Sequence, residues 1–334
     1  MKKIVGIIAA VAMAASVFAV DFTAGIQLKG NLFTYADGGD MSALDLNAGN
    51  SKDDKPFVFS ISGDRAGGQV KIYDSDASTA ADAKSKMAAS AWNIWFKPFD
   101  AVRIDLGNTD VGLNCETVTY WRGKTYGSDD WGYKATYNAD ALEIALFLSA
   151  KNAAWFSKAA GTTSVNEMAV KFGYNADFGN IAVIFDEKNK FDTLAFGAGY
   201  KGSFGSSTIF TDFVFEKGAA NGIKFDVDYK FSADAIGVEL YTGVWATDIS
   251  NFSDTMAIPL FIKASYALNG GSLYAKFMSG KVNKMDVNDP FKGQSHNVEV
   301  GYDGNLGAIS YEVAANYNIT TKGFSVPFWV RLSF

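Results

Sequence analysis

Cysteine and histidine are almost absent from this chain of 334 residues, which contains one of each. Exported proteins of this size often rely on disulfides, and Cys115 has no cysteine to pair with. His296 falls in an alternating segment with Val298 and Val300, on the apolar face, where it is poorly placed to serve as a base for a serine or an aspartate. The sequence therefore predicts that the protein is not an enzyme. It also predicts no cofactor, no metal site and no nucleic-acid partner.

Proline is scarce as well, with 5 residues against 33 glycines and an aromatic content of 15%. The amino-terminus has Lys2 and Lys3, an apolar stretch over 4–17 and a small-residue cleavage site ending at Ala19. This pattern predicts a secretory signal peptide over 1–19 and a single domain over 20–334. No later apolar run reaches the ~20 residues of a membrane helix. The exported chain is therefore either a soluble β-protein or a barrel that crosses a membrane with strands.

Strict alternation of apolar and polar residues favours the barrel. The clearest case is the segment 223–231, where apolar residues alternate with Lys224, Asp226, Asp228 and Lys230. Similar runs recur along the whole mature sequence and predict an all-β, antiparallel, up-and-down transmembrane barrel of about 18 strands. Several runs are shorter than the ~9–11 residues of a spanning strand, so 16 or 14 strands stay open.

The connections between these runs alternate between long and short. Short turns such as 139–140, 233–234 and 303–305 contain Gly, Asn and Asp, the residues that hairpin turns need. Long external loops on one side and short turns on the other describe an outer-membrane barrel with both termini in the periplasm. The predicted long loops are 36–55, 74–89, 108–130, 150–164, 246–255 and 280–293.

The final eleven residues form an alternating strand that ends on an aromatic residue. Its apolar face is made of Phe324, Val326, Phe328, Val330, Leu332 and Phe334. The segment 22–32 shows the same alternation, and we expect the two to be antiparallel neighbours at the seam that closes the barrel. Pro327 points to the interior side in this register and lacks a backbone donor, so we expect a local bulge beside it.

The signal peptide, the strand and turn pattern and the terminal strand together resemble bacterial outer-membrane porins, although no family motif is matched residue by residue. The resemblance implies residence in the outer membrane in contact with its lipid, and a likeness of 324–334 to the signal read by the barrel assembly machinery. It also implies a homotrimer and a third external loop, here 108–130, that folds into the lumen. This loop lacks the Pro-Glu-Phe-Gly-Gly phrase of general porins.

The positions that alternate with the apolar residues predict a mixed channel wall. Ten basic and eight acidic residues fall there, a balance that predicts weak ion selectivity unless a loop concentrates one sign. A water-filled channel is the preferred interpretation, and a barrel plugged by its own paired charges stays open. The predicted channel-lining residues are Arg103, Asp105, Lys134, Glu143, Lys171, Lys224, Asp226, Asp228, Lys230, Glu239, Lys263, Glu299 and Glu312.

The candidate constriction loop 108–130 carries Asp110, Glu116, Arg122, Lys124, Asp129 and Asp130. Folded inward, it would set these charges opposite Arg103 and Lys134 and create a transverse field. A solvated external loop is the alternative. The 7 tryptophans lie mostly near strand ends and are interpreted as interfacial anchors, with sugar stacking as the other option.

These patterns predict a porin that admits small hydrophilic solutes by passive diffusion. Two alternatives stay open at the level of the sequence. In one, the barrel only displays adhesive loops at the cell surface. In the other, it transports apolar substrates, which needs an apolar interior and therefore conflicts with the charged alternating positions.

Overall fold

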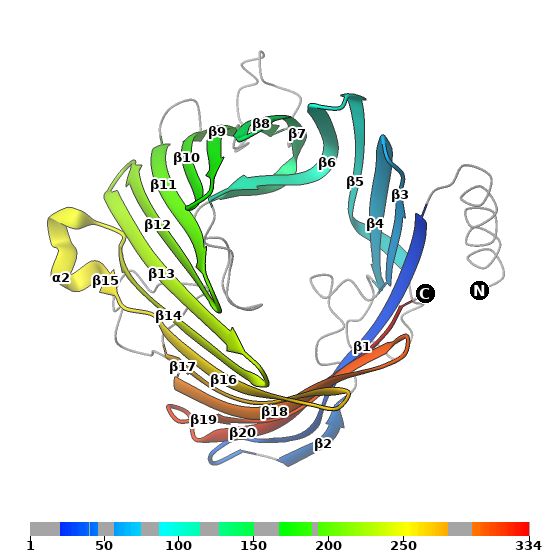
Figure 1. Cartoon of the computed structure of the whole chain (residues 1–334). Coiled ribbons are helices and arrows are strands. Elements are labelled where there is room, and N and C mark those ends of the chain that lie inside the picture. Colours follow the sequence, from blue (N-terminus) through cyan, green and yellow to red (C-terminus); the bar gives the residue numbers. More distant parts are fainter. Residues whose placement is uncertain are drawn as a thin grey trace.

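The computed structural model describes residues 21–39, 41–45, 57–74, 87–113, 127–149, 167–188, 193–279 and 296–333. Their strands form one antiparallel sheet that closes on itself into a barrel (Figure 1). The closing pair is β1 (Asp21–Tyr35) and β20 (Gly323–Ser333). No helix among the described residues is long and apolar enough to cross a membrane.

The wall follows the chain in order, each strand pairing with the next. Its other main strands are β3 (Phe57–Ser62), β4 (Ala66–Asp74), β5 (Met87–Phe99), β6 (Val102–Gly112), β7 (Gly127–Ala139), β8 (Leu142–Ser149), β9 (Glu167–Ala176), β10 (Gly179–Lys188), β11 (Thr193–Phe204), β12 (Ser207–Lys217), β13 (Asn221–Ala233), β14 (Ile236–Ala246), β16 (Leu260–Leu268), β17 (Gly271–Ser279), β18 (His296–Leu306) and β19 (Ile309–Asn318).

Two short strands, β2 (Met41–Asp45) and β15 (Met256–Ala257), do not count as separate crossings of the barrel wall, because each shares a partner strand with the strand that follows it. β2 pairs with the far half of β1, and β3 pairs with the near half of the same strand. β15 and β16 likewise share β14 as their partner. The sheet of 20 labelled strands therefore crosses the wall 18 times, since each of these two pairs counts as one strand. The predicted number of strands is confirmed.

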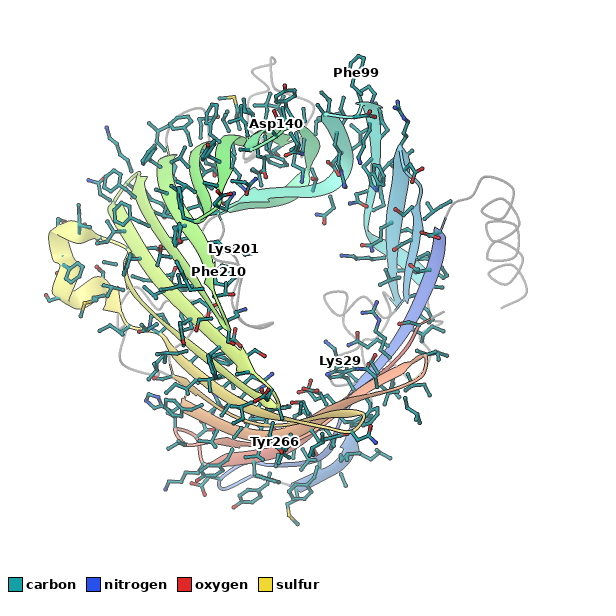
Figure 2. The ribbon with its side chains drawn as sticks, in the orientation of Figure 1. Lys29, Phe99, Asp140, Lys201, Phe210 and Tyr266 are labelled. Carbon is teal, nitrogen blue, oxygen red and sulfur yellow. The ribbon has the colours of Figure 1, made fainter. Side chains whose placement is uncertain are left out.

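The wall is apolar outside and polar inside. In β13, Phe225 is 44% exposed, whereas its neighbour Asp226 is fully buried. Residues directly opposite one another on paired strands share a face, so the register extends this assignment around the barrel. Figure 2 shows Lys29, Lys201 and Phe210 on the inner side and Phe99 on the outer side. This distribution is the reverse of that in a soluble sheet protein.

The seam between β1 and β20 is as predicted. Gly25 lies opposite Ser333 and Tyr35 opposite Phe324. The register shifts between Asn31 and Thr34, beside Pro327, which confirms the expected bulge. Five of the six apolar residues of the predicted assembly signal belong to β20, with Val330 and Leu332 exposed on the outer face, and Phe334 lies outside the described residues.

Three predicted loops contain strand residues, because strand pairing continues beyond the apolar part of each hairpin, whereas the predicted loop 246–255 matches the connection between β14 and β15 within one residue. β2 lies inside 36–55, and 87–89 belong to β5. Residues 108–112 and 127–130 are the paired ends of β6 and β7, and most of 246–255 forms a short 3-10 turn, η1 (Ile249–Asn251), and the helix α2 (Phe252–Thr255). Strand pairing depends on hydrogen bonds between backbone N–H and C=O groups, so polar side chains do not end a hairpin. Residues 150–164 and 280–293 lie outside the described residues.

The short turns lie at the opposite edge from these loops. Asp140 and Asp234 adopt φ values of 49° and 52°, a conformation that aspartate tolerates in tight turns better than most residues. Each ends a similar four-residue segment, Tyr-Asn-Ala-Asp over 137–140 and Phe-Ser-Ala-Asp over 231–234. The start of β1 and the end of β20 reach this same edge.

Candidate functional site

The charged residues that the sequence predicts to line the channel lie on the inner face of the barrel. The register connects them across the wall: Lys230 lies opposite Glu239, Glu239 opposite Lys263, and the row continues through Lys276 to Glu299. Lys201 and Phe210, which Figure 2 shows inside, lie opposite each other on the same face. All of the predicted channel-lining residues belong to strands and share this inner face.

Many of these charges pair across neighbouring positions. Arg103 contacts Asp105 at 2.6 Å, and Lys230 contacts Asp228 at 3.6 Å and Glu239 at 3.0 Å. Further pairs join Lys171 to Glu143 at 3.1 Å, and Lys224 to Glu216 at 3.6 Å. The wall is therefore electrically mixed, as predicted, and several of its acidic groups form ion pairs with neighbouring cations.

A denser polar network ties together β17, β18, β19 and β20. The Tyr274 hydroxyl contacts Glu299 at 2.8 Å and Glu312 at 2.5 Å. Lys276 forms an ion pair with Glu299 at 2.5 Å. The indole of Trp329 donates to Glu312 at 2.6 Å, and Asn316 donates to Glu299 at 2.9 Å. The two carboxylates thus hold adjacent strands together next to the closing seam.

Three aspartates lie close together on the inner face of β12 and β13. Asp212 lies directly opposite Asp226, and Asp228 is one position along the same face. All three are buried, and each takes part in polar or electrostatic interactions. Asp226 accepts hydrogen bonds from the Tyr241 hydroxyl and, at 2.8 Å, from the indole of Trp245.

The β6–β7 hairpin extends across the inner side of the wall toward β11 (Figure 1). Val111 and Leu113, at its end, are each only 4% exposed. A Cβ placed on Gly197 of β11 would lie 2.6 Å from a methyl carbon of Leu113, so this side chain rests on the β11 backbone. The apolar cluster that joins the hairpin to the wall comprises Val111, Leu113, Ala145, Phe147, Ala169, Ala182, Ile184, Ala195 and Val214.

The hairpin also contains part of the candidate constriction loop. Asp110 pairs in register with Asp129, and Asp130 pairs with Thr109, so these three acidic residues belong to the strand ends. Glu116, Arg122 and Lys124 lie outside the described residues. The described base of the loop enters the barrel instead of projecting away from it.

Three tryptophans occupy inner positions, and for them the interpretation as interfacial anchors is wrong. Arg103 lies over the ring of Trp95, while Trp245 and Trp329 donate to carboxylates. Their position was available from the sequence, because each alternates with apolar residues that face outward. Trp92, 40% exposed on the outer face, fits the original interpretation.

Sequence reasoning missed two further features of the inner face. It assigned no role to the small and apolar residues of β8–β12 that receive the hairpin, although Ala145, Ala169, Ala182 and Ala195 all fall at inward positions. It also left out Lys97 and Lys201. Among the described residues, no group of three His, Cys, Asp or Glu side chains is arranged to hold a metal ion. The lone His296 stacks on Phe277, with ring centroids 6.4 Å apart.

The fold is that of the bacterial outer-membrane porins. Solved structures of Pseudomonas aeruginosa proteins match nearly the whole chain. OccK2 (OpdF) matches with a TM-score of 0.56 and 9% sequence identity, over 94% of this chain and 97% of that one. OpdK matches with a TM-score of 0.55 and 10% identity over 94% and 98%, and OprD with 0.52 and 10% over 94% of both chains. No protein-family model matches the sequence. No curated protein matches it either.

Proposed function

We propose that the protein is a porin that forms a water-filled channel for passive diffusion of small hydrophilic solutes across the outer membrane. The observation that carries this proposal is the closed barrel of 18 strands with a charged inner face. Side chains fill the interior of a barrel of about 8 strands, whereas 16–18 strands leave room for an aqueous passage. The charged wall also argues against transport of apolar substrates. A solute channel of this kind performs no chemical step.

Location and partners follow from the same architecture. A belt of exposed apolar residues around the strands fits outer-membrane lipid, and an amino-terminal signal peptide over 1–19 fits export. The outward residues of β20, from Phe324 to Leu332, fit recognition by the barrel assembly machinery. Both termini then lie on the periplasmic side, with the short turns. We include a homotrimer, the assembly common among porins.

The β6–β7 hairpin narrows this channel. Its end lies against β11, so it occupies part of the cross-section that the strands enclose (Figure 1). The contacts of Val111 and Leu113 with the small residues of the wall hold it there. The size limit for solutes is therefore set by the hairpin rather than by the barrel itself. OccK2 has been solved in complex with glucuronate, a small polar solute, which fits a passage of this kind.

Conductance of the purified protein in planar bilayers tests the proposal. We expect stable open-channel steps on insertion, and swelling of loaded liposomes that falls off as sugars of increasing size are tested. Heat-denatured protein serves as the control. Folded protein that inserts without opening a channel would contradict the porin function and favour a surface barrel that only displays its loops.

An arginine on the outer face tests the contact with lipid. Phe225→Arg places a charge in the apolar belt and is expected to lower the free energy of unfolding by about 2–4 kcal/mol. The measurement is urea unfolding of protein folded into lipid vesicles. The matched control is Lys224→Arg, at the adjacent inward position, which should leave stability nearly unchanged. Equal stability of both variants would show that this face does not meet lipid.

A further inference from the structure

Three inward aromatic rings each carry two cations, and we call these groups the aromatic–cation units. In the Trp95 unit, Arg103 lies 4.6 Å and Lys97 5.9 Å from the ring centroid. In the Phe210 unit, Lys201 and Lys230 lie at 5.2 Å and 5.4 Å. In the Tyr274 unit, Lys263 and Lys276 lie at 4.9 Å and 5.2 Å. The same arrangement thus occurs at three places on one face of the sheet.

Among the described residues, each unit combines a cation that forms an ion pair with one that forms none. Arg103, Lys230 and Lys276 form ion pairs with carboxylates of the wall. Within the described part of the chain, Lys97, Lys201 and Lys263 form no ion pair, and each lies over its ring, although Lys263 also interacts electrostatically with Asp303 at longer range. The quadrupole of an aromatic ring attracts an ammonium group without cancelling its charge. These three lysines therefore keep a full positive charge on the inner face.

The depth of the charges adds to this asymmetry. The side chain of Arg103 is 39% exposed and that of its partner Asp105 2%, and Lys230 is 40% exposed above a fully buried Asp228. Short aspartate side chains stay near the backbone, whereas the long stems of lysine and arginine carry their charge away from it. At the Trp95 and Phe210 units the cation is therefore the more exposed partner, whereas in the Lys171–Glu143 and Lys224–Glu216 pairs, outside the units, the carboxylate is the more exposed.

The three units also lie at a similar level. Trp95 is near the end of β5, and Phe210 and Tyr274 are near the starts of β12 and β17, so each lies close to the short-turn edge. The strands that carry them are distributed around the wall (Figure 1). A solute that has passed the β6–β7 hairpin would therefore meet cations on several sides. Charged rings of one sign select ions of the opposite sign.

We infer that the channel prefers small oxyanions, carboxylates or phosphates, and that Lys97, Lys201 and Lys263 are the residues that confer the preference. The inference rests on the proposed channel function and adds the class of solute. Carboxylate and phosphate share the chemistry that ammonium groups bind, a compact negative charge with several acceptor oxygens. The aromatic rings are positioning groups, which hold the ammonium groups away from the buried carboxylates.

The reversal potential across a bilayer in a KCl gradient measures the preference. The folded wild-type channel should favour chloride over potassium, and the triple variant Lys97→Glu, Lys201→Glu, Lys263→Glu should reverse the sign. Lys322→Glu, on the exposed turn before β20, is the matched control and should behave as wild type. Absence of any channel would count against the proposed function. A wild-type channel that favours potassium, or a triple variant with unchanged selectivity, would overturn the inference alone.

A thiol-labelling version avoids any effect of charge reversal on folding. Lys201→Cys is made in a Cys115→Ser background and modified after insertion. A cationic methanethiosulfonate should restore the preference for chloride, and an anionic one should lower it below that of the unmodified channel. Identical selectivity with both reagents would refute a role for charge at this position.

Two further measurements identify the solute and test the rings. Liposome uptake of succinate should exceed that of 1,4-diaminobutane several-fold, with phosphate and succinate each reducing the chloride current. A block by only one of the two anions would assign the preference to that group, and equal uptake of succinate and the diamine would contradict the inference. Phe210→Leu keeps both lysines but should lower selectivity, whereas unchanged selectivity would exclude a positioning role for the ring.

Discussion

Replacement of Gly197 by leucine is expected to raise the single-channel conductance. A Cβ added to Gly197 would lie 2.6 Å from Leu113, 3.0 Å from Ile184 and 3.3 Å from Val214. A full leucine side chain would therefore displace the end of the β6–β7 hairpin. Because ion flow depends on the narrowest part of a pore, we expect an increase of about two- to fivefold. Polymers of graded size added to one side of the bilayer would show a larger exclusion limit.

Two controls distinguish displacement of the hairpin from general damage to the wall. Gly218→Leu, between β12 and β13, introduces the same side chain where a Cβ has only ordinary contacts, the nearest at 3.5 Å. It should leave conductance unchanged. Adding Leu113→Ala to Gly197→Leu makes room for the new side chain and should return conductance toward the wild-type value. Wild-type conductance in the Gly197→Leu variant would show that the hairpin does not limit the pore.

The contact that places the hairpin could not be predicted from the sequence. Leu113 meets β11 at Gly197, far along the chain, and nothing in the local pattern indicates which inward residues another segment covers. The burial of Val111 and Leu113 stabilises this contact by about 1.5–3 kcal/mol each. The sequence pattern around 108–130 showed polar residues and therefore predicted a loop, yet the paired strands extend well into it.

The barrel itself was predictable because its signal is local and repeated. In the segment 223–231, each apolar residue faces outward and each charged one inward, as the alternation requires. The seam was predictable for the same reason, since β1 and β20 show the same period. The distance of each charge from the wall was not predictable. The alternation of Asp105 or Lys97 with apolar neighbours shows only which side of the sheet the residue lies on. It does not say how far each charge reaches from the wall.

The inward tryptophans illustrate the same limit. Alternation places Trp329 on the inner face with Arg331, but its hydrogen bond to Glu312 depends on the register between β19 and β20. Register between strands is set by packing and turns over the whole sheet. The polar network around Tyr274 arises in the same way, because it depends on the register among the four strands β17 to β20, which no local sequence pattern contains.

Removal of the Lys276 side-chain charge is expected to destabilise the barrel strongly. Lys276 and Glu299 form an ion pair at 2.5 Å in which the two side chains are 7% and 3% exposed. Breaking a buried pair by removing one partner leaves a charge without compensation and costs about 3–5 kcal/mol. We therefore expect Lys276→Met to lower the free energy of unfolding by this amount, measured by urea unfolding of protein folded into lipid vesicles.

The pair formed by Lys171 and Glu143 provides the matched control, because it lies on the same face but is more exposed. Its atoms are 3.1 Å apart and its side chains are 14% and 29% exposed. Lys171→Met should therefore cost no more than about 1 kcal/mol. Adding Glu299→Gln to Lys276→Met removes the remaining charge and should recover part of the loss. Equal destabilisation by Lys276→Met and Lys171→Met would mean that water reaches both pairs, and that burial does not strengthen the Lys276–Glu299 pair.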